Sequence, residues 1–233
     1  MGQQAVDHAI RTLHYMERMP GVLGFQRGQT EEQGWAALEE IFSDAPGVVK
    51  RREALAEVVE LQNFRSNALG IQLGQRYASP AIITDGSTYP KPQRDPLLYY
   101  EPTTYPGAYL PHAWVEHQGR RMSTLDIVGH GGFGLIVGIG SRHWGAAAKA
   151  IQGMGVNLLV YAVGLRCQYD DVLGQWGGRR QISDRGALLV RPDRHIAWRC
   201  IDLPENPTEA LCSVFRQILA LDQLSTGKAG SDL

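Results

Sequence analysis

Apolar residues recur with a helical period at the start of this 233-residue chain and with a period of two further along. The helical stripe predicts an amphipathic helix that ends before Met19-Pro20-Gly21. Its members are Val6, Ala9, Ile10, Leu13 and Met16. No N-cap residue stands upstream of the stripe, so the first backbone donors of the helix lack partners. We therefore expect that a further segment once preceded this helix.

Two more helices are predicted before residue 77. Thr30 and Gln33 have the spacing of a capping box, which opens the second helix. Its predicted buried face consists of Trp35, Leu38, Ile41 and Phe42. The third helix begins near Lys50, and its apolar residues are Leu55, Val58, Val59, Leu61 and Phe64. The basic residues at its start, Lys50 to Arg52, are unfavourable for the helix dipole and are interpreted as a solvated face.

Prolines dominate the part of the chain that follows. They exclude a long helix between Asp85 and Pro111, so residues 78–111 are predicted to form an ordered linker. Tyrosines in this linker are too apolar for a free tether, and we expect them to lie along a neighbouring surface. These tyrosines are Tyr89, Tyr99, Tyr100, Tyr105 and Tyr109.

Short elements at α/β spacing occupy residues 112–225. Strands are predicted at His112 to Glu116, Ser123 to Val128, Phe133 to Ile139 and Val156 to Val163, and helices at about His143 to Gln152 and Thr208 to Leu221. Between them, Gly186 to Arg199 alternates with the period of half-buried strands around a Pro192-Asp193 turn, which predicts a β-hairpin. Its predicted core face consists of Leu188, Val190, Ile196 and Trp198. This order of elements predicts a thioredoxin-like α/β sandwich.

The predicted organisation therefore has four parts. A helical segment spans residues 1–77, the linker spans 78–111, the thioredoxin-like domain spans 112–225, and a frayed tail spans 226–233. The fold class is α/β, with the helical segment first.

Charge and cysteine content exclude several classes of partner. The 23 Lys and Arg residues nearly balance 24 Asp and Glu residues, so neither a nucleic acid nor a membrane is expected as a partner. The sequence has no signal peptide and no apolar run long enough to span a bilayer, which favours a cytoplasmic protein. The cysteines, Cys167, Cys200 and Cys212, form no CxxC pair and are interpreted as small buried hydrophobic residues.

Two glycine-rich motifs could bind phosphate groups, but each also has a structural interpretation. GHGGFG, Gly129 to Gly134, matches a dinucleotide fingerprint, yet it leads into an apolar strand instead of a helix and is better interpreted as a turn. GIGSRHWG, Gly138 to Gly145, precedes a helix and could hold an anion with Arg142, although a flexible strand-to-helix turn is the favoured interpretation.

Polar residues reveal no convincing active site. No histidine pair has zinc-ligand spacing among His112, His117, His130 and His143. The Ser183-Asp184 pair is attributed to turn chemistry, and Asp170 and Asp171 lie in a polar loop without an identified partner. We therefore assign no catalytic, cofactor-binding or metal-binding residue from the sequence.

Three long stretches resemble the C-terminal portion of FAD-dependent aromatic hydroxylases, the class A flavin monooxygenases of the dichlorophenol and phenol hydroxylase type. They are RDPLLYYEPTTYPGAYLPHAWV (Arg94 to Val115), STLDIVGHGGFGLIVGIGSRHW (Ser123 to Trp144) and DRGALLVRPDRHIAWR (Asp184 to Arg199). The resemblance implies a thioredoxin-like domain without redox cysteines, preceded by the segment that follows the flavin domain. Arg194 stands where many members have glycine, which implies mild strain if φ is positive there.

The resemblance implies oxygen insertion into a phenolic ring by a complete enzyme that uses FAD and NAD(P)H. The glycine-rich flavin-binding motifs of the family lie upstream of anything that matches this chain, so we expect a fragment or truncated copy without its own flavin site. The implied partners are the flavin-binding domain, the phenolic substrate of the complete enzyme, and further copies of this chain in a homo-oligomer. The alternative is a non-catalytic thioredoxin-like module for interaction or dimerisation. A redox protein of the thioredoxin type is disfavoured because CxxC is absent.

Overall fold

A computed structural model describes residues 2–221, and the predicted frayed tail at 226–233 lies outside them. The chain divides into two compact units. The helical unit comprises residues 2–74 and 93–100, and the sheet unit comprises 75–92 and 101–221, so the predicted linker contributes to both. Within the described residues, no helix is both long and apolar enough to cross a membrane.

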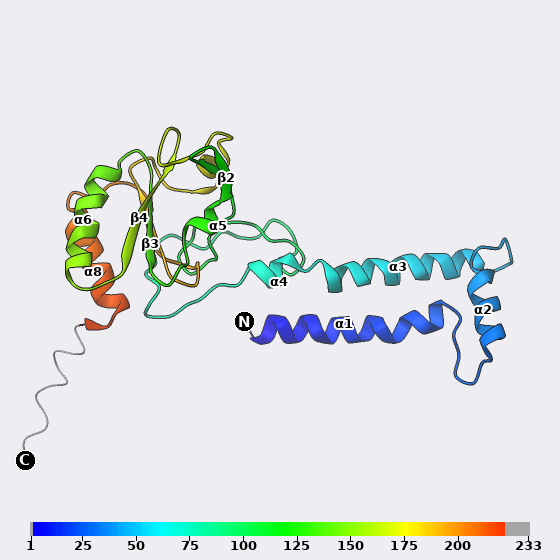
Figure 1. The fold of residues 1–233 in the computed structure, drawn as a ribbon. Helices are drawn as coiled ribbons and strands as arrows, with labels where there is room; N and C mark the ends of the chain where they lie inside the picture. The colour runs from blue at the N-terminus through cyan, green and yellow to red at the C-terminus, as the bar shows by residue number, and fades with distance from the viewer. Residues whose placement is uncertain (1, 222–233) are drawn as a thin grey trace, which may run out of the picture. The chain divides into compact units, whose positions relative to one another are not determined.

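The helical unit contains α1 (Gly2–Val22), α2 (Glu31–Glu40), α3 (Val48–Ser66) and the short α4 (Leu69–Leu73) (Figure 1). The predicted end of the first helix is wrong, because α1 continues through Pro20 to Val22. Proline lacks a backbone donor, but so close to the end of the helix it removes only a bond in the last turn. The amide of Leu23 still donates to the carbonyl of Met19 at 3.0 Å.

Helices α1 and α3 pack side by side in opposite directions. The His8 ring lies 5.1 Å from that of Phe64, and Arg18 forms an ion pair with Glu57 at 3.3 Å. The apolar stripe, defined as Val6, Ile10, Leu13 and Met16, is 47% to 62% exposed. His8 and Met19 are more buried than the stripe. With 3.6 residues per turn, position 8 lies about 160° around the helix from position 6, so α1 turns its apolar face away from α3.

The capping box of α2 is confirmed, but its predicted buried face is wrong. Thr30 accepts a hydrogen bond from the Gln33 amide at 3.3 Å, and the Gln33 side chain accepts one from the Thr30 amide at 3.0 Å. Ile41 is buried, whereas Trp35 is 58% exposed and Phe42 is 85% exposed. The helical unit offers no surface to cover these two aromatic side chains.

At the start of α3, Lys50 and Arg52 are exposed as a solvated face requires, but Arg51 is not. Arg51 donates to the carbonyl oxygens of Val22, Leu23 and Ala37 at 2.6 to 2.8 Å and pairs with Glu40 at 3.0 Å. It therefore satisfies backbone acceptors that are left unpaired near the ends of α1 and α2. The charges at this position predict exposure to solvent, because the sequence does not show that three helix ends meet here.

The sheet unit is built on a seven-stranded mixed sheet in the order β2-β1-β5-β4-β3-β6-β7 (Figure 1). The strands are β1 (Trp114–His117), β2 (Arg120–Ser123), β3 (Phe133–Val137), β4 (Leu158–Gly164), β5 (Tyr169–Asp170), β6 (Ala187–Val190) and β7 (Ile196–Cys200). β3, β4 and β5 pair in parallel, and the remaining neighbours are antiparallel. The mixed α/β class is confirmed.

The predicted strand from Ser123 to Val128 is wrong. The strand is β2, which ends at Ser123, and the one-turn helix α5 (Thr124–Ile127) follows it. Ser123 accepts from the Leu125 amide at 3.1 Å, and Asp126 accepts from the Ser123 amide at 2.9 Å, which forms a capping box. This local pairing outweighs the apolar run that had suggested an extended conformation. Sequence reasoning also missed β5 and the short helix α7 (Gln175–Arg179).

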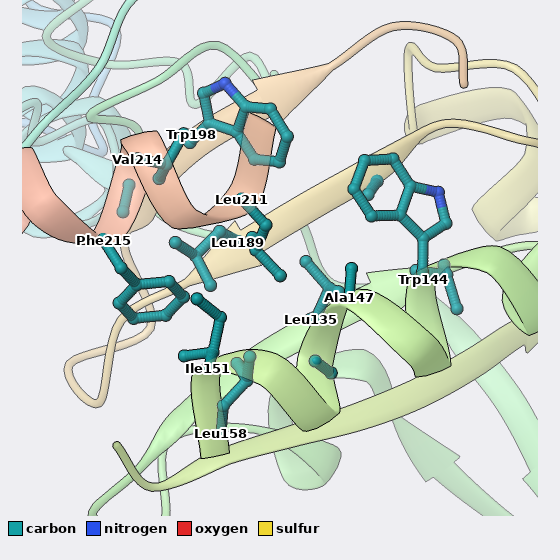
Figure 2. Packing of buried hydrophobic residues seen from close by; sticks show 14 residues of the cluster. Leu135, Trp144, Ala147, Ile151, Leu158, Leu189, Trp198, Leu211, Val214 and Phe215 are labelled. Carbon is teal, nitrogen blue, oxygen red and sulfur yellow. The ribbon is translucent and has the colours of Figure 1, made fainter. Parts of the chain in front are cut away.

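Both faces of the sheet are covered. On one face, α6 (Ser141–Gly153) and α8 (Pro207–Ile218) enclose a core with Trp144, Leu135 and Phe215 (Figure 2). On the other face, Leu110, Trp176 and Ile136 belong to a second core cluster. All four residues of β6 are completely buried, so the half-buried character predicted for the hairpin is wrong.

The hairpin itself is confirmed, but Trp198 lies on the opposite face from the one predicted. Val190 pairs with Ile196 and Leu189 pairs with Trp198, so Ala197 is an extra residue in β7. An extra residue reverses the alternation of the side chains that follow it. Leu188, Val190 and Ile196 therefore pack in the second cluster, whereas Trp198 packs with Leu189 beneath α6 and α8 (Figure 2).

Segments of the linker close the outer edge of β7. The Ile83 amide donates to the carbonyl of Ala197 at 2.8 Å. Further along, Ile196 exchanges hydrogen bonds with Gly107 and Ala108 at 2.7 and 2.9 Å. These bonds satisfy backbone groups that an open sheet edge would leave exposed. The linker thus brings Tyr105 and Tyr109 against Arg199 and His195 of the hairpin.

Candidate functional site

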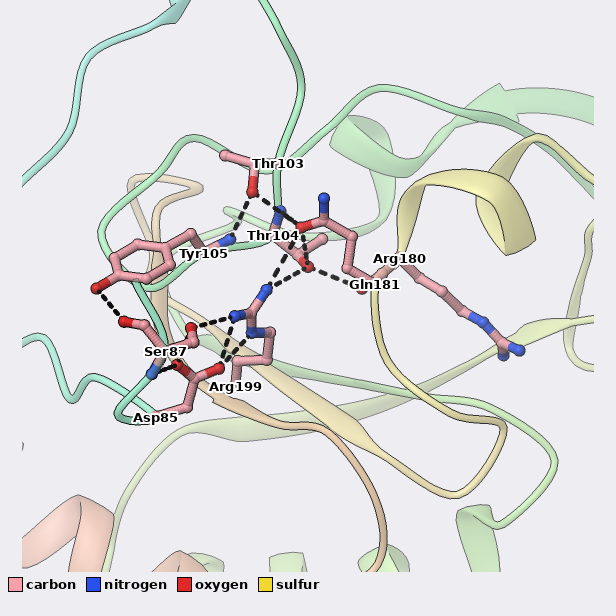
Figure 3. A network of polar contacts seen from close by, with 8 residues as sticks. All are labelled: Asp85, Ser87, Thr103, Thr104, Tyr105, Arg180, Gln181 and Arg199. Atoms are coloured by element: carbon pink, nitrogen blue, oxygen red, sulfur yellow. Dashed lines mark hydrogen bonds and ion pairs between the residues drawn. The ribbon is translucent and has the colours of Figure 1, made fainter. Parts of the chain in front are cut away.

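Arg199 on β7 is the centre of the most extensive buried polar network in the described chain (Figure 3). Its guanidinium forms an ion pair with Asp85, with Nε and Nη2 at 2.7 and 2.6 Å from Oδ2. Nη2 also donates to Ser87 Oγ at 2.9 Å. The side chains of Arg199 and Asp85 are 7% and 9% exposed, so water screens this pair little.

A second set of contacts joins the linker to Gln181. Gln181 Oε1 accepts hydrogen bonds from Thr103 Oγ1 and from the Thr104 amide, each at 2.9 Å (Figure 3). Arg199 Nη1 lies 3.4 Å from the same oxygen. Gln181 adopts a left-handed conformation with φ of 50°, which is strained for a residue with a side chain. The convergent donors hold the glutamine in this conformation.

The Asp85 carboxyl is held in its charged form. Burial of the carboxylate would raise its pKa, but hydrogen bonds from Ser87 and Arg199 and the positive charge of Arg199 outweigh that effect. The pKa of Asp85 is therefore lowered from its ordinary value of 3.8. Because the Asp85 carboxylate and the Arg199 guanidinium are paired with each other and with Ser87, the network fixes the linker against the sheet instead of leaving a reactive group free.

A cleft of about 260 Å³ lies beside this network. We call it the Arg76 cleft, and its lining includes Arg76, Tyr77, Ser79, Ile82, Thr84 and Tyr105. Tyr105 separates the cleft from the network: its ring centroid lies 5.7 Å from the Arg199 guanidinium and 6.0 Å from that of Arg76. Its hydroxyl donates to the Ser87 carbonyl at 3.2 Å. The cleft therefore has a cationic rim and an aromatic wall supported by a buried ion pair.

GHGGFG forms a turn between α5 and β3, as expected. Gly129 and Gly131 have φ of 87° and 82°, which favours glycine. A Cβ on Gly132 would lie 2.7 Å from the Asn157 side chain, and one on Gly134 would lie 2.8 Å from Val128. Because these glycines lack a Cβ, neighbouring side chains can pack against them, and β3 follows directly. This motif does not fit the pyrophosphate of FAD or NAD(P)H, so we derive no step through either cofactor.

The second glycine-rich stretch is also explained by packing. A Cβ on Gly138 would lie 2.6 Å from the Asp184 carbonyl, and one on Gly140 would lie 2.9 Å from Arg185 Cα. The Trp144 indole donates to the Arg185 carbonyl at 2.8 Å. The segment that leads into β6 therefore crosses the start of α6 at close range, which requires glycine on the opposing chain.

The other polar residues singled out in the sequence have separate partners. His112 contacts Ser123, His117 contacts the carbonyl of Gln168, and His130 contacts the carbonyl of Asp126, at 2.7 to 2.8 Å. Among the described residues, no group of three or more His, Cys, Asp or Glu side chains could hold a metal ion. His143 is exposed on α6.

The aspartates and Ser183 stabilise local backbone. Asp171 accepts from the amides of Trp176 and Gly177 at 3.1 and 2.7 Å, and Asp170 accepts from the Arg166 amide at 2.9 Å. Ser183 accepts from the Arg185 amide at 3.1 Å, which is turn chemistry. Asp184 forms an ion pair with Arg180. Asp202 belongs to a separate set of contacts. Hydrogen bonds from Ser183 and Arg185 lower the pKa of Asp202 to about 2.

The three cysteines are free and only partly buried, so their interpretation as buried residues is wrong. Burial raises the pKa of the Cys167 and Cys200 thiols, and nearby aspartates raise both further. Both are therefore poor nucleophiles at neutral pH. Arg194 has φ of 65° at the hairpin turn, so the strain expected there is present.

Sequence reasoning missed the Arg199 network and the Arg76 cleft. Asp85 and Arg199 are 114 residues apart, and Ser87 is 112 residues from Arg199. The only sequence signal was a charged residue within an apolar hairpin strand, next to Trp198. A charge in that position predicts a buried partner but does not identify it.

Comparisons with known proteins agree on one family. A family model described as the C-terminal part of aromatic-ring hydroxylases matches residues 103–220. The 2,4-dichlorophenol 6-monooxygenase of Delftia acidovorans is 33% identical over 222 residues, which are 95% of this chain and 38% of that enzyme. The phenol 2-monooxygenase of Pseudomonas sp. strain EST1001 is 35% identical over 73% of this chain and 28% of that enzyme.

A solved structure extends the similarity to the fold. The flavin-dependent monooxygenase PieE, solved in complex with FAD and substrate, matches with a TM-score of 0.82 and 40% identity. The match covers 94% of this chain and 38% of PieE. The chain therefore spans less than two fifths of the length of these relatives.

Proposed function

This chain belongs to the aromatic-ring hydroxylases, in which it corresponds to the C-terminal portion, and we propose that it serves an FAD- and NAD(P)H-dependent enzyme that hydroxylates a phenolic ring. The observation that carries the proposal is the alignment of 95% of this chain with a 2,4-dichlorophenol 6-monooxygenase. A phenol 2-monooxygenase aligned over 73% of the chain supports a phenolic substrate and a role in phenol degradation.

In this proposal, the flavin is held by the portion of the enzyme that precedes this chain, and the chain is a fragment of that enzyme. Asn157 and Val128 lie against Gly132 and Gly134 of the GHGGFG turn, and a strand follows it instead of a helix, so we propose that it offers no phosphate cradle. No residue described here is assigned to the flavin or to the chemical step. The chain contributes a rigid α/β domain, which we propose is thioredoxin-like, and helices that dock on the flavin-binding portion.

The apolar stripe of α1 is the proposed docking surface. Its four side chains are 47% to 62% exposed, and they face away from α3. Exposed apolar side chains on one helix face are typical of an interface. We propose that the flavin-binding domain covers the stripe in the complete enzyme, and that the isolated chain self-associates through it into homo-oligomers. Three free cysteines support the proposal that the protein is cytoplasmic.

A chimera tests the proposed function. The aligned portion of the Delftia acidovorans enzyme is replaced by this chain, and FAD content and 2,4-dichlorophenol-stimulated NAD(P)H oxidation are measured. We expect a yellow protein with stimulated oxidation, whereas the relative truncated before the aligned portion shows no stimulation. The matched variant pair is Leu13→Glu in the stripe, which reduces both readouts, and Glu57→Gln on α3, which changes neither.

Two results would contradict the proposal. Stoichiometric FAD uptake by the isolated chain would show that the flavin site lies within it. A folded chimera that binds FAD but shows no substrate-stimulated oxidation would favour the non-catalytic module instead. Circular dichroism of the chimera confirms folding before either conclusion is drawn.

A further inference from the structure

We propose that the Arg76 cleft is a binding site for a small aromatic carboxylate, an anion with a single ring. The proposal does not depend on the proposed function, because every residue that forms the cleft belongs to the sheet unit. Three properties of the cleft carry it: an arginine without an acidic partner, an aromatic and aliphatic lining, and a wall that is fixed before any ligand arrives.

The charge of Arg76 is not neutralised by the protein. Among residues 2–221, the ion pairs do not include Arg76. Its guanidinium instead lies 4.2 Å from the centroid of the Tyr89 ring. Stacking on a tyrosine face holds a guanidinium while leaving its N–H groups in the plane available. A carboxylate is the anion whose two oxygens match that planar set of donors.

The lining favours a ring over a purely inorganic anion. Ile82 and Pro106 are buried and line the cleft, and Tyr77 and Tyr105 line it with aromatic rings. Ser79 and Thr84 add exposed hydroxyl groups to this lining. Ligand sites combine such an apolar lining with a few polar groups that fix orientation.

The size of the cleft limits the ligand to one ring. Its 260 Å³ lies just below the roughly 300 to 1,000 Å³ of pockets for drug-sized ligands. A benzoate-sized molecule fits this space, whereas a dinucleotide or a polycyclic substrate does not. Its walls are open to solvent on the Arg76 side, since Arg76 and Ser79 are exposed.

The wall of the cleft is fixed by contacts on its far side. Tyr105 is anchored by its hydroxyl to Ser87 and by its amide to Thr103 Oγ1 at 3.2 Å. The Tyr77 amide donates to the Gly107 carbonyl at 3.0 Å, and Arg76 forms a β-bridge with Ala108. A ligand that enters the cleft therefore orders little of the protein, which reduces the entropic cost of binding.

A titration of the whole chain with benzoate tests the site. Amide NMR shifts of residues 76–84 and 104–107 are followed, with phenol as the neutral ring and acetate as the anion without a ring. We expect saturable benzoate binding with a dissociation constant on the order of 1 mM. Phenol and acetate should each bind at least about fivefold more weakly, because each lacks one of the two recognised features.

Three variants locate the binding. Arg76→Gln should weaken benzoate binding about fivefold. The matched control Arg142→Gln removes an exposed arginine on α6 and should change nothing. Ala78→Trp fills the cleft from its exposed rim and should abolish the shifts, while an unchanged melting temperature shows that the fold is intact.

Each of three outcomes would overturn the proposal. They are no saturable shift at residues 76–84 with benzoate, equal affinity for phenol and benzoate, and undiminished binding in folded Ala78→Trp. The first would show that the Arg76 cleft does not bind an aromatic carboxylate.

Discussion

The two units of this chain differ in how completely they bury their apolar side chains. In the sheet unit, every residue of β6 and most of β3 are completely buried between covering segments on both faces. In the helical unit, Leu13, Trp35 and Phe42 are 58% to 85% exposed. The sheet unit also exposes single apolar side chains, such as Leu165 at 67% and Leu173 at 60%. It nevertheless encloses two large core clusters, whereas the exposed apolar side chains of α1 lie along one helix face that needs a cover.

The stabilising interactions differ accordingly. Burial of large side chains dominates the sheet unit, with Trp144 and Phe215 completely buried between α6 and α8 (Figure 2). In the helical unit, Arg51 links the ends of α1 and α2 through three backbone carbonyls. Net hydrogen bonds contribute less than buried apolar area per group, so we expect the helical unit to be the less stable of the two.

The largest expected effect comes from a tryptophan pair that differs in burial. Trp198→Ala removes a side chain that is 8% exposed and should cost about 3 to 5 kcal/mol of unfolding free energy. Trp35→Ala removes one that is 58% exposed and should cost less than about 0.5 kcal/mol. Denaturant unfolding measures both, and equal costs would break the comparison between the units.

Local features of this fold could be predicted from the sequence, and long-range ones could not. The capping box of Thr30 and Gln33 and the Pro192-Asp193 hairpin depend on neighbours in the chain, and both were predicted. The face of Trp198 depends on one extra residue opposite β6, which leaves no mark in the apolar pattern. Ser123 satisfied a strand pattern and a capping pattern at once, and only the structure distinguishes them.

Candidate sites were less predictable than elements for the same reason. The Arg199 network joins residues 85–87, 103–105 and 180–181, which approach one another only when the linker pairs with β7. Lys50 to Arg52 had looked like a single solvated run, yet Arg51 reaches two other helices. The charges alone predict exposure, because the sequence does not show which groups pack against a charged side chain in the folded chain.

The buried ion pair tests whether the sheet unit also depends on a polar contact. Arg199→Met leaves the Asp85 carboxylate buried without its partner and should cost about 3 kcal/mol. The lowered pKa of Asp85 adds a pH dependence: its contribution is complete above pH 3.8 and is lost as the pH falls below that value. Chemical unfolding between pH 3 and 7 measures the loss.

The control for this pair is Asp85→Asn, which should remove the acid-dependent part of the stability difference while keeping a hydrogen-bonding side chain. If the wild-type chain and Asp85→Asn lose stability in parallel below pH 4, the lowered pKa of this carboxyl does not contribute.

A smaller effect is expected from the polar anchor of the helical unit. Arg51→Met removes hydrogen bonds to the carbonyls of Val22, Leu23 and Ala37 and should cost about 2 kcal/mol. Hydrogen exchange of amides in α1 and α2 should accelerate. Lys50→Met, at an exposed neighbouring position, should leave those amides unchanged. Equal acceleration in both variants would show that Arg51 contributes no more to α1 and α2 than an exposed residue does.

The smallest effect separates backbone strain from packing in each unit. Gly131 in the sheet unit and Gly47 in the helical unit have φ of 82° and 89°, and no atom lies within 4 Å of a Cβ added to either. Gly131→Ala and Gly47→Ala should therefore each cost about 1 kcal/mol through left-handed strain alone, regardless of how well the surrounding core is packed. Gly145→Ala in α6, also without a close neighbour, should instead stabilise by about 0.5 to 1 kcal/mol, because helical alanine is favoured over glycine.

Amide exchange within the unit that carries each substitution reports the change, and isothermal titration with NADPH and FAD accompanies Gly131→Ala. We expect no nucleotide binding to either the wild-type chain or this variant, since Asn157 and Val128 lie against Gly132 and Gly134 and a strand follows the GHGGFG turn. Binding of either nucleotide to the wild-type chain that Gly131→Ala abolishes would contradict the turn interpretation, and a cost well above 2 kcal/mol would show that the turn carries packing as well as strain.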